Sequence, residues 1–441
     1  MKIKKSVYIC QTCGFESLGW LGKCTECGSW GSLVETVVSR NSGGKNQNSK
    51  ITKSNIVNLS NVETKSSTRI STKISELDRV LGGGIVPGQV ILIAGEPGIG
   101  KSTILMQLSE TLGNILYVSG EESAHQIALR GKRLGVKNTN DILILEDTDI
   151  DAIIDNVMEI IDAKRNLSAV IIDSIQTMQT SDLSGMAGAA GQVRECTYRL
   201  VRLAKSTSVP VIIVGHVTKQ GSVAGPALLM HLVDTVLWFE GSRDLSFRLL
   251  RARKNRFGAT DEVGIFTMED KGLISVDDTS HLFLTELDKM IAGSAVTSVM
   301  EGTRPLLVEI QSLVIPTKMA FPKRVAQGID AKRLELLLAV LQRRAQVPVN
   351  DFDVFVNVVG GIKVKETGAD LAICLSVASA YYDKPIPKKL VSIGEVGLLG
   401  EVRKVTSEDR RIKETKRLGY KQIVTHTDFG YLKDAVKKIV K

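Results

Sequence analysis

A glycine-rich stretch between an apolar run and a helix-like run constrains this chain more than any other feature. It reads Gly95-Glu96-Pro97-Gly98-Ile99-Gly100-Lys101-Ser102-Thr103, after QVILIA and before ILMQLSETL. The spacing G-x4-G-K-S is typical of a P-loop, whose backbone N–H groups wrap phosphates while its lysine contacts the β- and γ-phosphates. Its serine hydroxyl binds Mg²⁺. The sequence therefore predicts that residues 95–103 bind ATP, with Lys101 on the phosphates and Ser102 on magnesium.

Two further apolar runs end in carboxylates. The run ILYVSGEES carries Glu121 and Glu122 at its end, and SAVIIDS ends at Asp173. Ligands of parallel α/β sheets bind beyond the carboxyl ends of the strands. We expect Glu121 or Glu122 to polarise the water that attacks the γ-phosphate, unless both lie in a solvated turn, and Asp173 to hold magnesium through a coordinated water.

A third strand-like run, VPVIIVGHVTK, ends in polar residues and is followed by the loop QGSVAGPA. A polar residue at this strand end can sense the γ-phosphate and pass its state to the loop. His216 fits that role, and it fits equally a structural histidine with satisfied hydrogen bonds. Lys219 is a candidate for DNA binding or for this coupling.

Basic residues mark two more segments. The runs VLWFEG, FRLLRARKNRFG and GIFTM indicate antiparallel strands with a turn at KNRFG. Residues two apart in a strand point to the same side, so Lys254 and Arg256 are placed for phosphate, from DNA or from the ATP of a neighbouring subunit, or form an ordinary basic hairpin tip. A helix-like run before them has cations that either meet DNA phosphates or form a solvated face. These are Arg194, Arg199, Arg202 and Lys205.

Near the N-terminus, four cysteines follow the pattern C-x2-C-x10-C-x2-C. They are Cys10, Cys13, Cys24 and Cys27. Two such thiolate pairs can complete a tetrahedral Zn²⁺ site, and without a secretion signal a disulfide framework is not expected. We predict a structural zinc finger over residues 1–38, folded mainly by the metal, with Trp20 and Trp30 covering the site.

Composition and charge divide the rest of the 441-residue chain, whose net charge is +9. Residues 39–66 are rich in Ser, Asn, Lys, Gly and Thr and predict a flexible linker. Two larger domains are expected, at 67–280 and 285–441. Both ends of the chain are basic, whereas the middle is close to neutral. The chain has neither a membrane-length apolar run nor a signal-peptide pattern, so we expect a cytoplasmic protein without a membrane partner.

Four signatures, in this order, resemble the bacterial RadA (Sms) DNA-repair proteins along the whole chain. They are the four-cysteine finger with GKCTECGSW, the P-loop GEPGIGKST, the KNRFG turn and a C-terminal region like Lon proteases. The resemblance implies an α/β fold with a RecA-like P-loop ATPase core, an N-terminal zinc ribbon and a C-terminal Lon-protease-like α+β domain. It also implies that Glu121 is the catalytic glutamate and that Lys254 and Arg256 act in trans.

The same resemblance implies a function and partners. Proteins of this family look like ATP-driven homohexameric motors that bind single-stranded and branched DNA and promote branch migration of recombination intermediates with RecA. Two rivals remain open: an ATP-gated adaptor without motor activity, and an ATP-dependent protease. Directional movement of a DNA junction would separate the motor from the adaptor.

The C-terminal region resembles the Lon proteolytic domain in the segments VEIQSLV, VNVVGG and IGEVGLLGEV. Proteolysis of that type needs a serine nucleophile and a lysine base. Ala369 stands at the serine position and the lysine position falls near Asp409. We therefore expect an inactive scaffold that shapes the ring and binds DNA through Lys332, Arg333 and the basic C-terminus.

Overall fold

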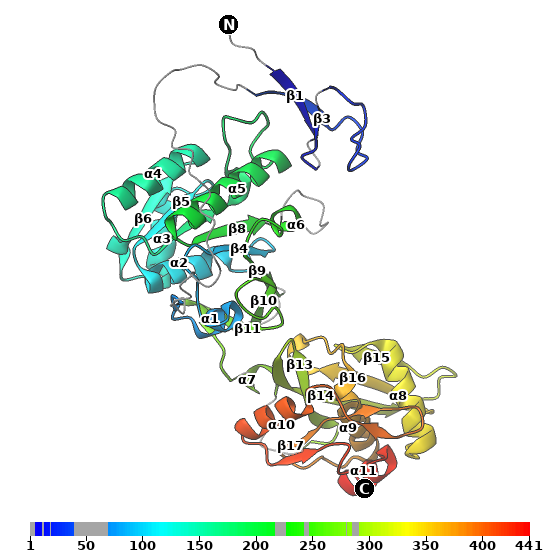
Figure 1. The fold of residues 1–441 in the computed structure, drawn as a ribbon. Helices are drawn as coiled ribbons and strands as arrows, with labels where there is room; N and C mark the ends of the chain where they lie inside the picture. The colour runs from blue at the N-terminus through cyan, green and yellow to red at the C-terminus, as the bar shows by residue number, and fades with distance from the viewer. Residues whose placement is uncertain are drawn as a thin grey trace, which may run out of the picture. The chain divides into compact units, whose positions relative to one another are not determined.

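A computed structural model describes most of the chain. The described residues are 5–10, 13–17, 19–38, 69–216, 226–241, 247–278, 280–284 and 291–441. The predicted linker 39–66 and Lys219 lie outside them. The chain divides into two compact units (Figure 1). The first comprises 1–242 and 248–275, and the second comprises 243–247 and 276–441.

The first described segment is a small antiparallel sheet in the order β2-β1-β3. Its strands are β1 (Lys5–Cys10), β2 (Glu16–Ser17) and β3 (Leu33–Val38). The buried residues here are few and include Cys10, Cys24 and Leu33. So small a core gives little hydrophobic stabilisation, which is why such a module depends on bound metal.

A nine-stranded sheet forms the centre of the first unit, in the order β12-β11-β10-β9-β4-β8-β7-β5-β6. The six strands from β9 to β6 in this order are parallel, and β10 to β12 extend the sheet with antiparallel pairs. The strands are β4 (Val90–Gly95), β5 (Ile115–Ser119), β6 (Ile142–Glu146), β7 (Ala169–Asp173), β8 (Val211–His216), β9 (Thr235–Glu240), β10 (Phe247–Asn255), β11 (Val263–Glu269) and β12 (Gly272–Ser275).

Helices cover both faces of this sheet (Figure 1). They are α1 (Ser75–Leu81), α2 (Lys101–Leu112), α3 (Ala124–Leu134), α4 (Ile150–Asp162), α5 (Ala190–Thr207) and α6 (Pro226–Leu229). Successive side chains of a strand point to opposite faces. In β4, Ile91 and Ile93 pack in a cluster with α1, α2 and α3, whereas Val90 and Leu92 pack with α4 and α5. This double burial explains why the central strands are apolar throughout.

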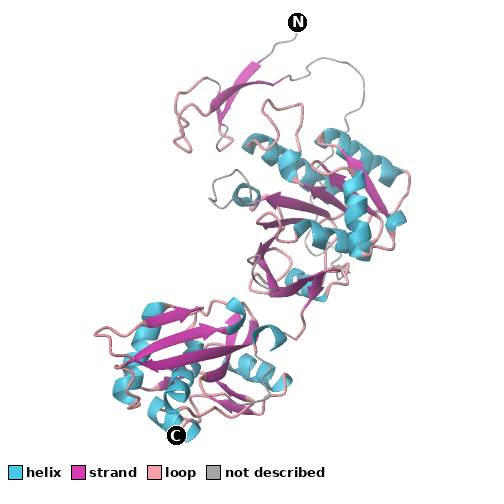
Figure 2. Cartoon of the chain, turned by 180° about the vertical axis from the view of Figure 1, so that it is seen from behind, coloured by secondary structure: helices cyan, strands magenta, loops and turns pink. Residues whose placement is uncertain are grey.

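The second unit contains a six-stranded mixed sheet in the order β15-β16-β14-β13-β17-β20 and a separate β18-β19 pair. Figure 2 shows strands of this unit with helices beside them. The strands are β13 (Ser294–Glu301), β14 (Arg304–Pro316), β15 (Arg324–Gln327), β16 (Phe352–Val358), β17 (Leu390–Ser392), β18 (Glu395–Val396), β19 (Val402–Arg403) and β20 (Gln422–Val424). The helices are α7 (Ser280–Phe283), α8 (Ala331–Arg344), α9 (Asp370–Tyr382), α10 (Glu408–Arg417) and α11 (Leu432–Ile439). The first ten residues of α9 are all buried, so this helix forms the centre of the unit.

None of the helices in the described part of the chain is long and apolar enough to cross a membrane.

Candidate nucleotide and metal sites

The predicted P-loop connects β4 to α2. Strand β4 ends at Gly95 and α2 begins at Lys101, so the loop lies at the carboxyl end of a central strand. Gly98 has φ of +77° and Gly100 has φ of +119°, values that side chains other than glycine rarely adopt. The Lys101 ammonium is buried within the loop and donates hydrogen bonds to the backbone oxygens of Gly95 (2.9 Å) and Glu96 (3.0 Å). The N-terminus of α2 and its lysine together form an anion-binding cradle.

Strand order brings the predicted polar strand ends to the same edge. Gly95 is in register with His216, and Ser119 is in register with Asp173. Because β4, β8, β7 and β5 are adjacent and parallel, their carboxyl ends lie together. The predicted phosphate, magnesium and water-polarising residues therefore share one site.

Each carboxylate of the site is held by a hydroxyl that the sequence analysis did not identify. Ser174 Oγ donates to Glu121 Oε1 at 2.6 Å, and Tyr117 Oη donates to Asp173 Oδ2 at 2.6 Å. Ser174 directly follows Asp173, so its place in the sequence could have identified it as a residue of this site. Tyr117 lies 56 residues away in sequence and only strand pairing places it there.

The two adjacent glutamates have different partners. Glu122 forms an ion pair with Arg130 of α3, and its backbone N–H and carbonyl bond the Ser119 hydroxyl. Glu121 Oε1 instead lies 3.6 Å from His216 Nε2 and accepts the Ser174 hydrogen bond. Glu121 is thus the glutamate that belongs to the shared strand-end site.

Electrostatics couple these groups. Burial lowers the pKa of Lys101, and the charges of Asp173 and Glu121 oppose this shift. Burial and the Lys101 charge lower the pKa of His216 below its usual 6.5, so its imidazole is neutral at pH 7. Within the described residues, neither ring nitrogen of His216 forms a hydrogen bond. The described residues therefore do not support the alternative that His216 is a structural histidine with satisfied hydrogen bonds.

The donor set of this edge fits magnesium. Ser102 stands in the first turn of α2, and Asp173 ends β7, so a hydroxyl and a carboxylate are available. Mg²⁺ prefers such oxygen ligands and commonly completes its shell with water and nucleotide phosphates. The residues present are those that the P-loop chemistry requires.

Lys254 and Arg256 lie near the amino ends of the parallel strands, at the side of the sheet opposite the P-loop. Lys254 is in register with Val236, which is level with Leu92, three residues before the end of β4. Its ammonium donates to the backbone oxygens of Met230 (2.7 Å) and Val233 (2.8 Å), which precede β9. Both cations thus lie near the amino ends of the parallel strands, about 10 Å or more along the sheet from the P-loop end.

A buried carboxylate holds Arg256 at that side of the sheet. Asp234 accepts from Arg256 Nη1 at 3.3 Å and from Lys205 at 2.6 Å, and its backbone oxygen accepts the Arg256 N–H at 3.1 Å. The Arg256 side chain nevertheless remains 55% exposed. It is therefore anchored at one side and accessible to an anion from outside.

Arg199 and Lys205, two of the four cations predicted on the helix that is now α5, form ion pairs. Arg199 binds three carboxylates, from Asp151, Asp182 and Glu195. Lys205 binds Asp234 and the Gly88 oxygen. Arg199 is therefore largely enclosed by carboxylates, whereas Lys205 is paired with Asp234 and still 47% exposed, as a solvated face would be.

The cysteine cluster has the geometry of a four-thiolate metal site. All four Sγ atoms lie within 4.8 Å of one another, with Cys10 to Cys27 at 3.6 Å and Cys13 to Cys24 at 3.5 Å. Tetrahedral zinc with Zn–S bonds of about 2.3 Å places sulfurs about 3.8 Å apart, and a disulfide would need about 2 Å. Burial and the neighbouring thiols raise the pKa of Cys13 to about 12, whereas hydrogen bonding with Ser29 lowers the pKa of Cys27.

One expectation about this module is wrong. Trp20 is 64% exposed and Trp30 is 77% exposed, so neither ring buries the site as predicted. Cys10 and Cys24 are instead buried with Leu33, Tyr8 and Phe15 around them. Trp20 lies in irregular backbone and Trp30 forms an isolated β-bridge with Lys23, both outside the small buried cluster.

In the second unit, the structure shows the surroundings of Ala369 and Asp409, which stand at the positions of the Lon-type serine and lysine. Ala369 is buried immediately before α9, and Asp409 is exposed on α10. Arg411 is fully buried and forms an ion pair with the partly exposed Glu366, and its guanidinium also donates to the Ser298 oxygen. Within the described residues, Ala369 and Asp409 thus offer no Ser and Lys pair.

The two cations predicted to bind DNA in this unit differ. Lys332 is exposed. Arg333 forms a bidentate ion pair with Asp370, which is buried, and also donates to the Val396 oxygen. The Arg333 guanidinium therefore links α8 to α9. This ion pair disfavours the predicted contact between Arg333 and DNA.

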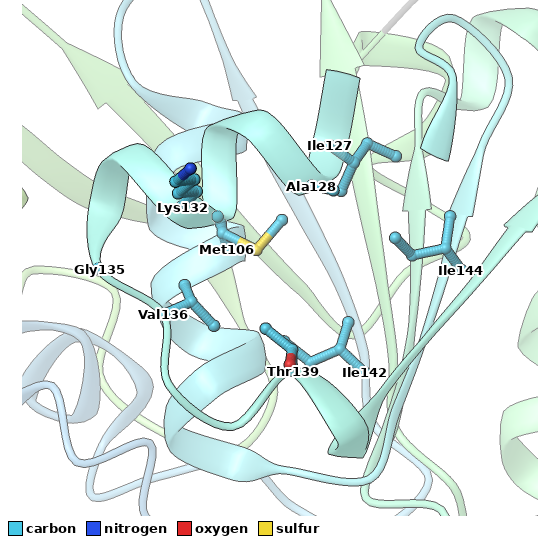
Figure 3. Close-up of a pocket in the computed structure, with 10 residues that line it drawn as sticks. Met106, Ile127, Ala128, Lys132, Gly135, Val136, Thr139, Ile142 and Ile144 are labelled. Carbon is cyan, nitrogen blue, oxygen red and sulfur yellow. The ribbon is translucent and has the colours of Figure 1, made fainter. Parts of the chain in front are cut away.

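A separate apolar pocket of about 360 Å³ lies between α2, α3 and β6 (Figure 3). Met106, Ile127 and Ile144 are among its lining residues, and Lys132 and Thr139 are the lining residues with polar side chains. It shares none of the strand-end residues above, so it belongs to a different part of the domain.

Comparison with known families agrees with this geometry. Residues 57–222 match a family described as an AAA domain, and residues 8–35 match one described as a rubredoxin metal binding domain. The chain is 46% identical over 427 residues to the DNA repair protein RadA of Bacillus subtilis, which covers 95% of this chain and 92% of that protein. Proteins of the same name from Aquifex aeolicus and Pseudomonas aeruginosa are each 46% identical, over 421 and 427 residues, again with 95% and 92% covered.

Proposed function

This chain belongs to the DNA repair protein RadA family, and we propose that it is a DNA-dependent ATPase motor of recombinational DNA repair. In this proposal it binds single-stranded and branched DNA as a homohexameric ring and promotes branch migration of recombination intermediates together with RecA. ATP hydrolysis changes the arrangement of neighbouring subunits and so moves the DNA.

One observation carries the ATPase part of the proposal. Lys101, Glu121 and Asp173 come from separate segments and meet at the carboxyl edge of one parallel sheet. There Lys101 contacts the β- and γ-phosphates, Glu121 polarises the attacking water, and Asp173 with Ser102 would hold Mg²⁺, which neutralises phosphate charge. Together they are the minimum set for hydrolysis by a P-loop enzyme.

The position of Lys254 and Arg256 supports an assembly. Both lie at the sheet edge remote from their own P-loop, so they cannot serve the ATP bound by the same chain. A head-to-tail ring places one edge of each subunit against the opposite edge of the next. In such a ring these cations stabilise the phosphate charge of the neighbour's ATP during transfer.

The remaining parts of the chain have supporting roles in this proposal. The four cysteines hold Zn²⁺, which folds the N-terminal ribbon, and this module binds DNA or a partner protein. The second unit is a proteolytically inactive Lon-like scaffold that shapes the ring. Lys332 is the better candidate there for DNA contact, because Arg333 is paired with Asp370.

ATP hydrolysis with and without single-stranded DNA at two salt concentrations tests the proposal. Lys101→Ala is the blank, because it removes the phosphate-binding ammonium. We expect DNA to stimulate hydrolysis and the stimulation to weaken with salt, since contacts to phosphates release counterions. A branch-migration assay with RecA then tests the motor.

Two outcomes would count against the proposal in different ways. Hydrolysis that is indifferent to DNA would favour an ATP-gated adaptor with a protein partner. Degradation of casein that disappears on replacement of Ala369 would favour a protease, although its buried position before α9 speaks against this.

A further inference from the structure

Tyr117 is a buried residue of β5 that reaches the magnesium carboxylate. Its side chain is fully buried among apolar residues packed against α1, α2 and α3. Its hydroxyl donates to Asp173 Oδ2 at 2.6 Å, across from β5 to the end of β7. Contacts of this length between a hydroxyl and a carboxylate are strong, charge-assisted hydrogen bonds.

The Tyr117 hydroxyl has a fixed position in the domain core. The ring is fixed by core packing, and its hydroxyl position is therefore fixed as well. The donor does not have to be ordered when nucleotide arrives.

This bond constrains which oxygen of Asp173 is available. Asp173 Oδ2 is occupied, while within the described residues no hydrogen bond to Oδ1 is formed. A carboxylate anchored through one oxygen keeps the other in a defined direction. Without this hydrogen bond, the Asp173 side chain would lose rotational entropy each time it accepted a hydrogen bond from a magnesium-bound water.

We propose that Tyr117 is a positioning residue for magnesium: its hydroxyl anchors Oδ2 of Asp173 so that Oδ1 is presented to the water shell of Mg²⁺ bound with ATP. The inference rests on the proposed ATPase function and extends it to a residue that does not touch the nucleotide. Asp173 remains the residue that faces the ion.

The test is Tyr117→Phe, which removes one oxygen and keeps the ring. We expect the Mg²⁺ concentration for half-maximal hydrolysis to rise roughly tenfold, the scale of a lost charged hydrogen bond. ATP binding measured in the presence of a chelator should be unchanged, because the P-loop and Lys101 are intact. A merely structural role would leave the Mg²⁺ dependence as in the wild type.

Ser109→Ala is the matched control. Ser109 is also fully buried in this domain, and its hydroxyl donates only to the Leu105 oxygen of its own helix at 2.8 Å. It should lower thermal stability by a similar amount and leave the Mg²⁺ titration unaltered. A shift of the titration in Ser109→Ala equal to that in Tyr117→Phe would overturn the proposal.

Binding of a fluorescent ADP with and without Mg²⁺ provides a second measurement. Asp173→Asn should abolish the Mg²⁺ enhancement, and adding Tyr117→Phe to it should change nothing more, because the hydroxyl acts through Asp173. An additional loss in the double variant would refute the role. If the Lys101→Ala variant hydrolysed ATP as fast as the wild type, the proposed ATPase function itself would be refuted. That outcome can be distinguished from a failure of the Tyr117 proposal, because it does not involve Tyr117.

Discussion

Glu121 and Glu122 are consecutive residues with opposite surroundings, and they make the sharpest test of the site at the level of single residues. Glu121→Gln should lower the hydrolysis rate roughly 10²- to 10⁴-fold and retain ATP binding, because a positioned base contributes about that much. Glu122→Gln should retain activity. It only breaks a pair with Arg130 in which the glutamate side chain is 36% exposed, and such pairs contribute about 1 kcal/mol or less. Single-turnover hydrolysis and nucleotide binding distinguish these outcomes; a Glu122→Gln variant as inactive as Glu121→Gln would contradict the assignment.

The N-terminal ribbon is an element whose fold depends on its metal rather than on its core. Cys24→Ser should abolish bound zinc and unfold residues 5–38, because three thiolates and a small core do not replace the fourth ligand. DNA-independent ATP hydrolysis should persist, since the P-loop, β5 and β7 lie in a separate core. Zinc stoichiometry and amide exchange of the ribbon provide the measurement, with Cys196→Ala as control, because Cys196 is buried in α5 and outside the cluster. One zinc per chain in Cys24→Ser would show that the four-ligand assignment is wrong.

For the whole molecule, the two edges of the ATPase sheet predict complementation between inactive subunits. Lys101→Ala removes the phosphate ligand of its own site, and Arg256→Ala removes the cation proposed to act on a neighbour. Mixed rings should regain roughly a quarter of wild-type hydrolysis, because a quarter of random head-to-tail interfaces join an intact P-loop to an intact Arg256. Arg253→Ala is the matched control on β10, since Arg253 pairs with Glu240, and it should stay active alone. Activity that stays at zero although tagged subunits co-purify would rule out the trans role.

Local patterns were enough to predict the chemistry that one continuous segment contains. The P-loop residues 95–103 and the four cysteines are read from spacing alone, because a tight turn or a thiolate pair is built by neighbours in the chain. The apolar run before Asp173 likewise predicted a buried strand that ends in a carboxylate, and β7 has those limits. These features depend mainly on residues that are neighbours in the chain, so the sequence by itself was enough to predict them.

Contacts between distant segments were decided only by the tertiary structure. Tyr117 and Asp173 are 56 residues apart, and Arg333 and Asp370 are 37 apart, so strand register and helix packing create both pairs. The same register placed Lys254 and Arg256 at the edge opposite the P-loop, and core packing left Trp20 and Trp30 exposed. The physical reason is that a side chain's partner depends on which elements are adjacent, and periodicity along one segment does not contain that information.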